Sequence, residues 1–282
     1  MQRMDKKAIF LSIAQQIAGG ELAFPTSAQL AMKVRQLLDD PDCAIEAVAK
    51  LVQAEPLLSA RVVAMANSIA YNRSGREISD VRTAVSRLGF RTLRTLATAV
   101  ITRSLAGGKG SQSHAELAAQ LWEHTAHVAS LAQLIARRVT KQDPETAMFA
   151  GIVHEVGGFY MLSRAKDFPG LLDGDMNDWL DEGEAEIGRA VLRVLAVPES
   201  VTVAIENYWS GYLAMPPVSL ADTLLLAKQL APVPSPLRPE NDPASHEGMS
   251  ANIEMIIGEE TLTGILAESA EEVRSLTNAL KF

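Results

Sequence analysis

A single cysteine, Cys43, stands among the 282 residues of the sequence. One thiol cannot form a disulfide within the chain, and it cannot supply the several cysteine ligands of a structural zinc site. The chain also lacks an uninterrupted apolar run of the roughly 18–20 residues that a membrane-spanning helix needs, and residues 1–5 do not open a signal peptide. We therefore expect a soluble, cytoplasmic protein without a disulfide framework.

Alternating apolar and polar residues, the pattern of a half-buried strand, are absent from the N-terminal part of the chain. Apolar residues there recur at helical spacing, as in Ile9, Ile13 and Ile17. With 48% hydrophobic residues the chain can bury a sizeable core, and its net charge of -8 disfavours general binding to nucleic acid. The sequence therefore predicts an all-α fold.

Two shifts in composition divide the chain. The first, GGKGSQS at residues 107–113, predicts a flexible joint. The second carries five of the thirteen prolines over residues 232–250 and predicts a loop or linker. We expect four units: an N-terminal helical bundle over 1–106, a second helical subdomain over 112–232, a proline-rich linker over 233–250 and a helical extension over 251–282.

The stretch AMFAGIVHEVGGFYML at residues 147–162 predicts one central helix that is packed on all sides. Asp143 and Pro144 precede it as the expected N-cap and first helical residue. His154 and Glu155 interrupt the apolar run side by side. Burying an unpaired charge is costly or shifts its pKa, so we expect these two side chains to have polar partners.

Two further polar residues lie at apolar positions of other expected helices. His124 fills a vacancy in the apolar stripe of the helix after the joint, and Asp222 lies inside the run SLADTLLLA. With His154 and Glu155 they make up the imidazole and carboxylate ligand set of a Zn, Mn or Fe ion in a metal-assisted hydrolase. Ligands this far apart in sequence can meet only in the core of a helical bundle. Spacing alone also permits a simpler interpretation, a core histidine that is satisfied by a backbone carbonyl.

Several motifs resemble those of known families. WEHTAHVA at 122–129, GIVHEVG at 151–157 and LAD at 220–222 are similar to the signature of HD-domain metal-dependent phosphohydrolases. The chain more closely resembles the HDOD family, a divergent bacterial branch associated with signalling. The segments that carry this resemblance are FPTS at 24–27, LLDDPD at 37–42, QAEPLLSARVVAMANS at 53–68, ISDVRTAVSRLG at 78–89 and LAVPESV at 195–201. The resemblance implies an HD-domain-like bundle with an N-terminal helical subdomain.

The resemblance also implies a degenerate metal site. His124, His154 and Asp222 match metal-binding positions of the HD pattern, but Glu155 stands in place of its aspartate. Gly158 stands where active relatives often have a lysine that binds substrate phosphate, and residues 207–209 (Asn-Tyr-Trp) replace a further histidine pair. These three departures predict that the site is not catalytic. If a cofactor is bound, the resemblance implies a divalent metal such as Mn, Fe, Zn or Mg.

The function predicted from the sequence is a non-catalytic signal-transduction module that acts through protein contacts. The resemblance implies partners of the response regulator, kinase or diguanylate cyclase class and no membrane. The alternative is a metal-dependent phosphohydrolase that acts on a nucleotide or phosphomonoester through the degenerate site. A third hypothesis, nucleic-acid binding, rests on the arginines at positions 73, 76, 82, 87, 91, 94 and 103, although a solvated face or pairing with acids of the other half is the simpler interpretation.

The four polar residues must satisfy one another if no metal is present, because a buried polar group without a partner costs about 1–3 kcal/mol. We predict a direct or water-bridged hydrogen bond between His154 and Asp222, with His124 close by. Such a bond would tie the central helix to the helix around residues 218–230.

Overall fold

Helices form all the regular structure in the residues that the computed structural model describes, which are 6–22, 26–106, 112–174, 176–238 and 259–281. The all-α prediction is therefore confirmed. The elements are α1 (Lys6–Ala18), α2 (Thr26–Leu37), α3 (Ile45–Gln53), α4 (Pro56–Asn67), α5 (Val81–Leu105), α6 (Gln112–Ile135), η1 (Ala136–Thr140), α7 (Pro144–Val153), α8 (Val156–Arg164), η2 (Trp179–Gly183), α9 (Glu184–Val194), α10 (Glu199–Ser210), α11 (Leu220–Leu230) and α13 (Glu259–Leu280). None of the described helices has the length and apolar character needed to cross a membrane.

Helices α2, α3 and α4 pack around the long helix α5 in the N-terminal part of the chain. Glu55 caps α4 by accepting a hydrogen bond from the backbone N–H of Leu58, and Pro56 is the first residue of that helix. Asp80 caps α5 in the same way. Gly89 has a φ of 72°, so α5 consists of two helical segments that meet at a kink.

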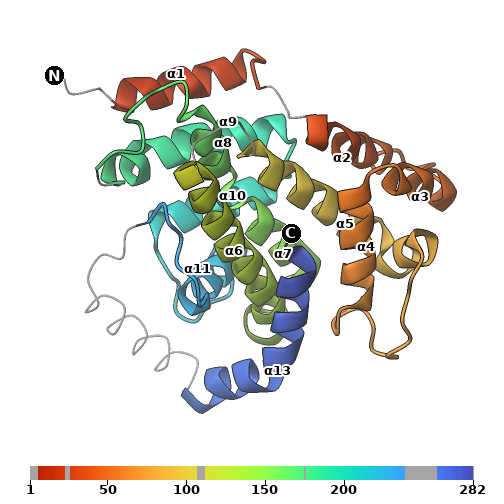
Figure 1. Cartoon of the computed structure of the whole chain (residues 1–282). Coiled ribbons are helices and arrows are strands. Elements are labelled where there is room, and N and C mark those ends of the chain that lie inside the picture. Colours follow the sequence, from red (N-terminus) through yellow and green to blue (C-terminus); the bar gives the residue numbers. More distant parts are fainter. Residues whose placement is uncertain (1–5, 23–25, 107–111, 175, 239–258, 282) are drawn as a thin grey trace.

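Helix α6 runs through the second half of the molecule and contacts α7, α11 and α13 (Figure 1). The contact with α7 is close because Gly151 has no side chain. A Cβ atom at Gly151 would lie 2.5 Å from Cα of Ala129 in α6. This close approach brings the α6 backbone next to the end of α7, where His154 follows.

The two ends of the chain pack against elements that are distant in the sequence. Helix α1, expected in an N-terminal bundle, packs against α9 and η2 instead. Its Phe10 lies edge-on to Trp179, with 5.7 Å between the ring centroids, and both rings contact the space that a side chain at Gly183 would fill. At the other end, α13 packs against α4 and α6 (Figure 1). Residues 251–258 of the predicted C-terminal extension lie outside the described residues.

The predicted central helix over 147–162 is wrong in one respect, because it is two helices. Asp143 caps α7 through the N–H of Thr146, as expected, but α7 ends at Val153 and α8 begins at Val156. Glu155, between them, has a non-helical backbone. The break allows each helix its own close contact, since Gly157 of α8 packs on the backbone of Gly188 in α9 while α7 packs on α6. His154 and Glu155 lie at this break.

Candidate functional site

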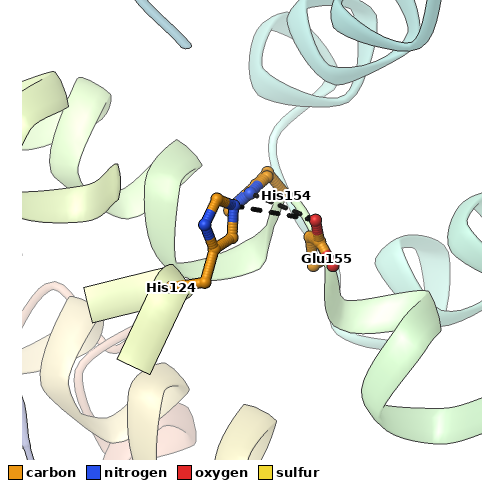
Figure 2. Close-up of side chains that lie close together, drawn as sticks. All are labelled: His124, His154 and Glu155. Atoms are coloured by element: carbon orange, nitrogen blue, oxygen red, sulfur yellow. Dashed lines mark ion pairs between the residues drawn. The ribbon is translucent and has the colours of Figure 1, made fainter. Parts of the chain in front are cut away.

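His124, His154 and Glu155 converge in the interior of the molecule (Figure 2). His124 lies in the middle of α6, while His154 and Glu155 occupy the break between α7 and α8. Nε2 of each imidazole lies 3.8 Å from Oε1 of Glu155. No more than 4% of the surface of any of the three residues is exposed. The fold therefore brings together three potential metal ligands whose donor atoms all lie within 4.8 Å of one another.

Backbone carbonyl groups orient both imidazoles. Nδ1 of His154 lies 2.7 Å from the carbonyl oxygen of Gly151, and Nδ1 of His124 lies 2.7 Å from that of Val233. A carbonyl oxygen can only accept, so each Nδ1 carries the proton and each Nε2 presents a lone pair. Neither Nε2 atom nor Oε1 of Glu155 has a hydrogen-bond partner among the described residues. The simpler interpretation, a histidine satisfied by a carbonyl, therefore accounts for Nδ1 and leaves Nε2 unexplained.

Burial keeps the two imidazoles neutral. It lowers the pKa of His154 to about 4, although Glu155 acts in the opposite direction, and it also lowers the pKa of His124. Burial opposes ionisation of Glu155 too, but its pKa is lowered because the imidazoles, the Arg238 guanidinium and the Ser235 hydroxyl outweigh that effect. Neutral imidazoles beside a carboxylate are the protonation states that metal binding requires.

The three side chains fit a single divalent cation. Two histidines and one carboxylate are a common ligand set for Zn²⁺ and Fe²⁺, which leave further positions to water or substrate. Two ligands at about 2.1 Å from one ion are at most about 4.2 Å apart, a limit that Glu155 meets with each imidazole. The hydrogen bonds at Nδ1 are the kind that orient metal-binding histidines. His124, His154 and Glu155 would therefore hold the ion.

Asp222, the fourth predicted ligand, does not join this cluster. It is the third residue of α11 and forms a capping box with Ser219. Its carboxylate accepts hydrogen bonds from the backbone N–H groups of Ala214, Val218 and Ser219 and from the Ser219 hydroxyl, at 2.6–3.0 Å. The predicted direct hydrogen bond between His154 and Asp222 is absent, since both carboxylate oxygens have other partners. The apolar residues around Asp222 concealed a helix cap, although the capping Ser219 is the first residue of the same run.

The HDOD domain family model matches residues 24–210 of the sequence. This chain belongs to the HDOD domain family. No curated protein matches it. The family assignment confirms the resemblance that the motifs carry, and the break that holds His154 and Glu155 falls inside the matched region.

Solved structures share the fold along nearly the whole chain. A protein from Shewanella amazonensis, whose name proposes a metal-dependent phosphohydrolase, has a TM-score of 0.71 at 21% identity and covers 98% of this chain and 100% of its own. An HDOD domain protein of unknown function from Geobacter sulfurreducens has a TM-score of 0.60 at 23% identity, with 97% of each chain covered. A protein from Marinobacter aquaeolei, whose name proposes signal transduction, has a TM-score of 0.57 at 17% identity and covers 100% of this chain and 68% of its own. At these identities the similarity shows the fold alone.

A short segment of this HDOD protein, residues 232–238, covers the three-residue cluster, and we call it the covering segment. Its Val233 accepts the hydrogen bond from His124, and the Ser235 hydroxyl donates to Oε2 of Glu155 at 2.9 Å. Leu237 is buried directly over Gly158, where a Cβ atom would collide with its Cδ1. The sequence predicts a linker from residue 233 onward. Its first six residues lie on the site, and residues 239–250 lie outside the described part of the chain.

A buried ion pair anchors the covering segment. Arg238 donates two hydrogen bonds of 2.6 Å to the carboxylate of Glu184, the first residue of α9. Its guanidinium lies 5.3 Å from the ring centroid of Tyr208, and that ring packs edge-on against His154. Burial raises the pKa of Glu184 to about 7, although Arg238 acts in the opposite direction. The segment is therefore tied to both α9 and α10 beside the cluster.

Sequence reasoning missed Ser235, Leu237, Arg238 and Glu184 as parts of the site. The only sequence signal for the first three is the run S-P-L-R at 235–238, in which one apolar and one cationic residue interrupt the prolines. The arginine-rich segment behaves largely as the simpler interpretation predicts. Its ion pairs with acids are Arg82–Glu46, Arg94–Asp39 and Arg91–Asp143, the last of which reaches the second half of the chain.

Proposed function

We propose that this HDOD protein is a non-catalytic signalling module that acts through protein contacts. The observation that supports the proposal best is the position of the covering segment. It contacts His124 and Glu155 directly, and its Arg238 packs on the Tyr208 ring that lies against His154. A phosphate ester must reach the open positions of a metal to be hydrolysed. Here the covering segment lies directly against the cluster, since Ser235 donates to Oε2 of Glu155 and the Val233 carbonyl accepts from Nδ1 of His124.

Gly158 gives this proposal a second support. The family resemblance implies that active relatives often have a phosphate-binding lysine at this position. Leu237 fills the space into which any side chain at position 158 would extend. A lysine at position 158 would therefore require the Leu237 side chain to move.

The family resemblance supports a protein partner of the response regulator, kinase or diguanylate cyclase class. We expect the protein at native expression level to copurify with a signalling protein of one of these classes. The interaction should persist in His154→Ala and in Glu155→Gln variants that retain the fold, because a contact surface does not need the cluster.

Turnover is the direct test. Wild type and Arg238→Ala should show no metal-dependent hydrolysis of mononucleotides or aryl phosphates with Mn²⁺, Mg²⁺ or Zn²⁺. Arg189→Ala is the matched control, because it removes an arginine from a more exposed pair with Glu206 and leaves the covering segment intact. Hydrolysis by wild type that is lost in His154→Ala would overturn the proposal. Hydrolysis that appears only in Arg238→Ala would also overturn it, since the segment would then be the lid of an enzyme.

The second candidate, a metal-dependent phosphohydrolase, is favoured by one observation. Three buried donor atoms point at one another without hydrogen-bond partners among the described residues. An ion held there would activate a water molecule for attack on phosphorus. Elemental analysis of purified wild type and of His124→Ala, combined with the turnover assay, separates the two candidates. Metal that is lost in His124→Ala, together with turnover, would support the phosphohydrolase. Metal without turnover would mean that the ion only holds α6 and the α7–α8 break together.

A further inference from the structure

A cavity of about 360 Å³ lies where the N-terminal helices meet the second half of the chain. Helices α2 and α5 supply one wall, and α7 with the N-terminal end of α10 supplies the other. Three arginines line it: Arg35, Arg91 and Arg94. Its volume falls in the range of small-molecule sites, which is about 300–1,000 Å³. None of the lining residues belongs to the metal-ligand cluster or to the covering segment.

The positive charge in this cavity is only partly balanced. Arg91 is paired with Asp143, and Arg94 donates to Asp39 at 2.9 Å and to the carbonyl oxygen of Leu38 at 2.7 Å. Arg35 differs, because no hydrogen bond or ion pair joins it to any described residue. It is half-buried, and its pKa is lowered by burial and by the neighbouring Arg94, with Asp39 acting in the opposite direction.

Arg94 can donate a further hydrogen bond to a ligand. Its Nε–H is buried and has no hydrogen-bond partner among the described residues. Glu145 also lines the cavity, but its two oxygens are already engaged by the hydroxyls of Tyr71 and Thr92 and by the amide of Gln133. Neutral donors therefore occupy the oxygens of Glu145, and among the carboxylates of the lining it is Asp39 that pairs with Arg94. An oxyanion between Arg35 and Arg94 would satisfy both groups.

The remaining lining matches a ligand with an apolar body. Phe149, Leu195 and Val201 form apolar wall, and Ser200 lies in the first turn of the twelve-residue helix α10. The first turn of a helix presents free backbone N–H groups and a partial positive charge, both of which favour an anion. Guanidinium groups on one side and a helix N-terminus on the other suit a phosphate better than a carboxylate, because a phosphate offers three oxygens.

We propose that this cavity binds a small organic phosphate of mononucleotide size, with the phosphate between Arg35 and Arg94 and the organic body against Phe149. The site bridges the two halves of the chain through α2 and α5 on one side and α7 and α10 on the other. The same two helices, α7 and α10, continue to His154 and Tyr208. The proposal goes beyond the signalling function and holds whether or not the metal-ligand cluster is catalytic.

Calorimetric titration with adenosine 5′-monophosphate tests the proposal, with adenosine as the uncharged control. Wild type should bind the nucleotide, more weakly as salt is added, and should not bind adenosine measurably. Arg35→Gln should weaken binding by at least about tenfold, the loss expected for one charge-assisted contact. Lys33→Gln, which removes an exposed cation two residues away on α2, should leave the affinity unchanged.

A second variant guards against misfolding of the first. Ser200→Glu places a negative charge at an exposed position at the rim, where the α10 dipole tolerates it, and should also weaken binding by at least about tenfold. No heat of binding for wild type at millimolar nucleotide would overturn the proposal. Equal affinity for adenosine, or equal affinity of the Arg35→Gln and Lys33→Gln variants, would overturn it too.

Discussion

Replacement of Asp222 separates a helix cap from a metal ligand. In the structure its carboxylate accepts four hydrogen bonds, three of them from the backbone N–H groups of Ala214, Val218 and Ser219. A hydrogen bond to a charged group contributes about 1.5–3 kcal/mol. Val218 and Ser219 are exposed, so water replaces part of what the carboxylate provides, whereas Ala214 is only half-exposed. We therefore expect Asp222→Ala to lower the free energy of unfolding by about 2–4 kcal/mol.

Asp222→Asn should lower it by less, about 1–2 kcal/mol, because one amide oxygen can still accept while the amide nitrogen faces donors. Urea unfolding followed by circular dichroism measures both variants, with and without a chelator. Asp181→Ala is the control, since its exposed carboxylate has no hydrogen-bond partner among the described residues. The losses should be the same with the chelator present.

The pH dependence gives a further check on the cap. Burial opposes ionisation of Asp222, but the Ser219 hydroxyl and the three backbone N–H groups outweigh it and lower the pKa. A lowered pKa means that the stability contributed by the carboxylate is complete above the pKa of the unfolded chain, about 3.9, and is lost as the pH falls through the folded value. The difference between wild type and Asp222→Ala should therefore shrink in acid. A loss that occurs only in metal-loaded protein, or one below about 0.5 kcal/mol, would refute the cap.

Two other expected outcomes concern packing and the anchor of the covering segment. Gly151→Ala should destabilise the fold by about 1–3 kcal/mol, because its Cβ would lie 2.5 Å from the α6 backbone. Gly264→Ala in α13 is the control, since its Cβ meets nothing within 4 Å, and it should stabilise the fold by about 0.5–1 kcal/mol. Thermal unfolding measures both variants, and an unchanged stability of Gly151→Ala would contradict the close contact. The raised pKa of Glu184, about 7, means that the folded state holds the proton more tightly than the unfolded chain, so the stability of wild type relative to Glu184→Gln should fall as the pH rises from 4.5 toward 7. Urea unfolding of both proteins at pH values on either side of 7 checks the sign, and a difference that grows with pH would show that the ion pair with Arg238 dominates.

Local sequence signals were sufficient for most helix boundaries. Asp143 caps its helix as predicted, because capping depends on a side chain and an N–H group three residues apart. The kink at Gly89 also has a local cause, because glycine tolerates the positive φ that the kink requires. Apolar periodicity was enough to assign the all-α class, and the motifs at 24–27, 37–42, 53–68, 78–89 and 195–201 were enough to assign the HDOD family.

The tertiary structure decided which polar residues meet. His154, Glu155 and Asp222 look alike in sequence, each a polar residue in an apolar run, because periodicity reports burial and not the partner. The break between α7 and α8 depends on two separate backbone contacts, Gly151 on Ala129 and Gly157 on Gly188, that no local pattern reveals.

The covering segment shows the same limit. Its prolines predict an irregular chain, and residues 232–238 are irregular. Where an irregular chain lies depends on long-range contacts, here those of Arg238 with Glu184 and of Leu237 with Gly158. Sequence alone determined the all-α class and named His124, His154 and Glu155 among the candidate ligands, because periodicity and motifs depend on residues a few positions apart. Only the folded chain decided that His124 joins His154 and Glu155 and that residues 232–238 cover them, because these contacts join residues about 30 to 80 positions apart that packing brings together.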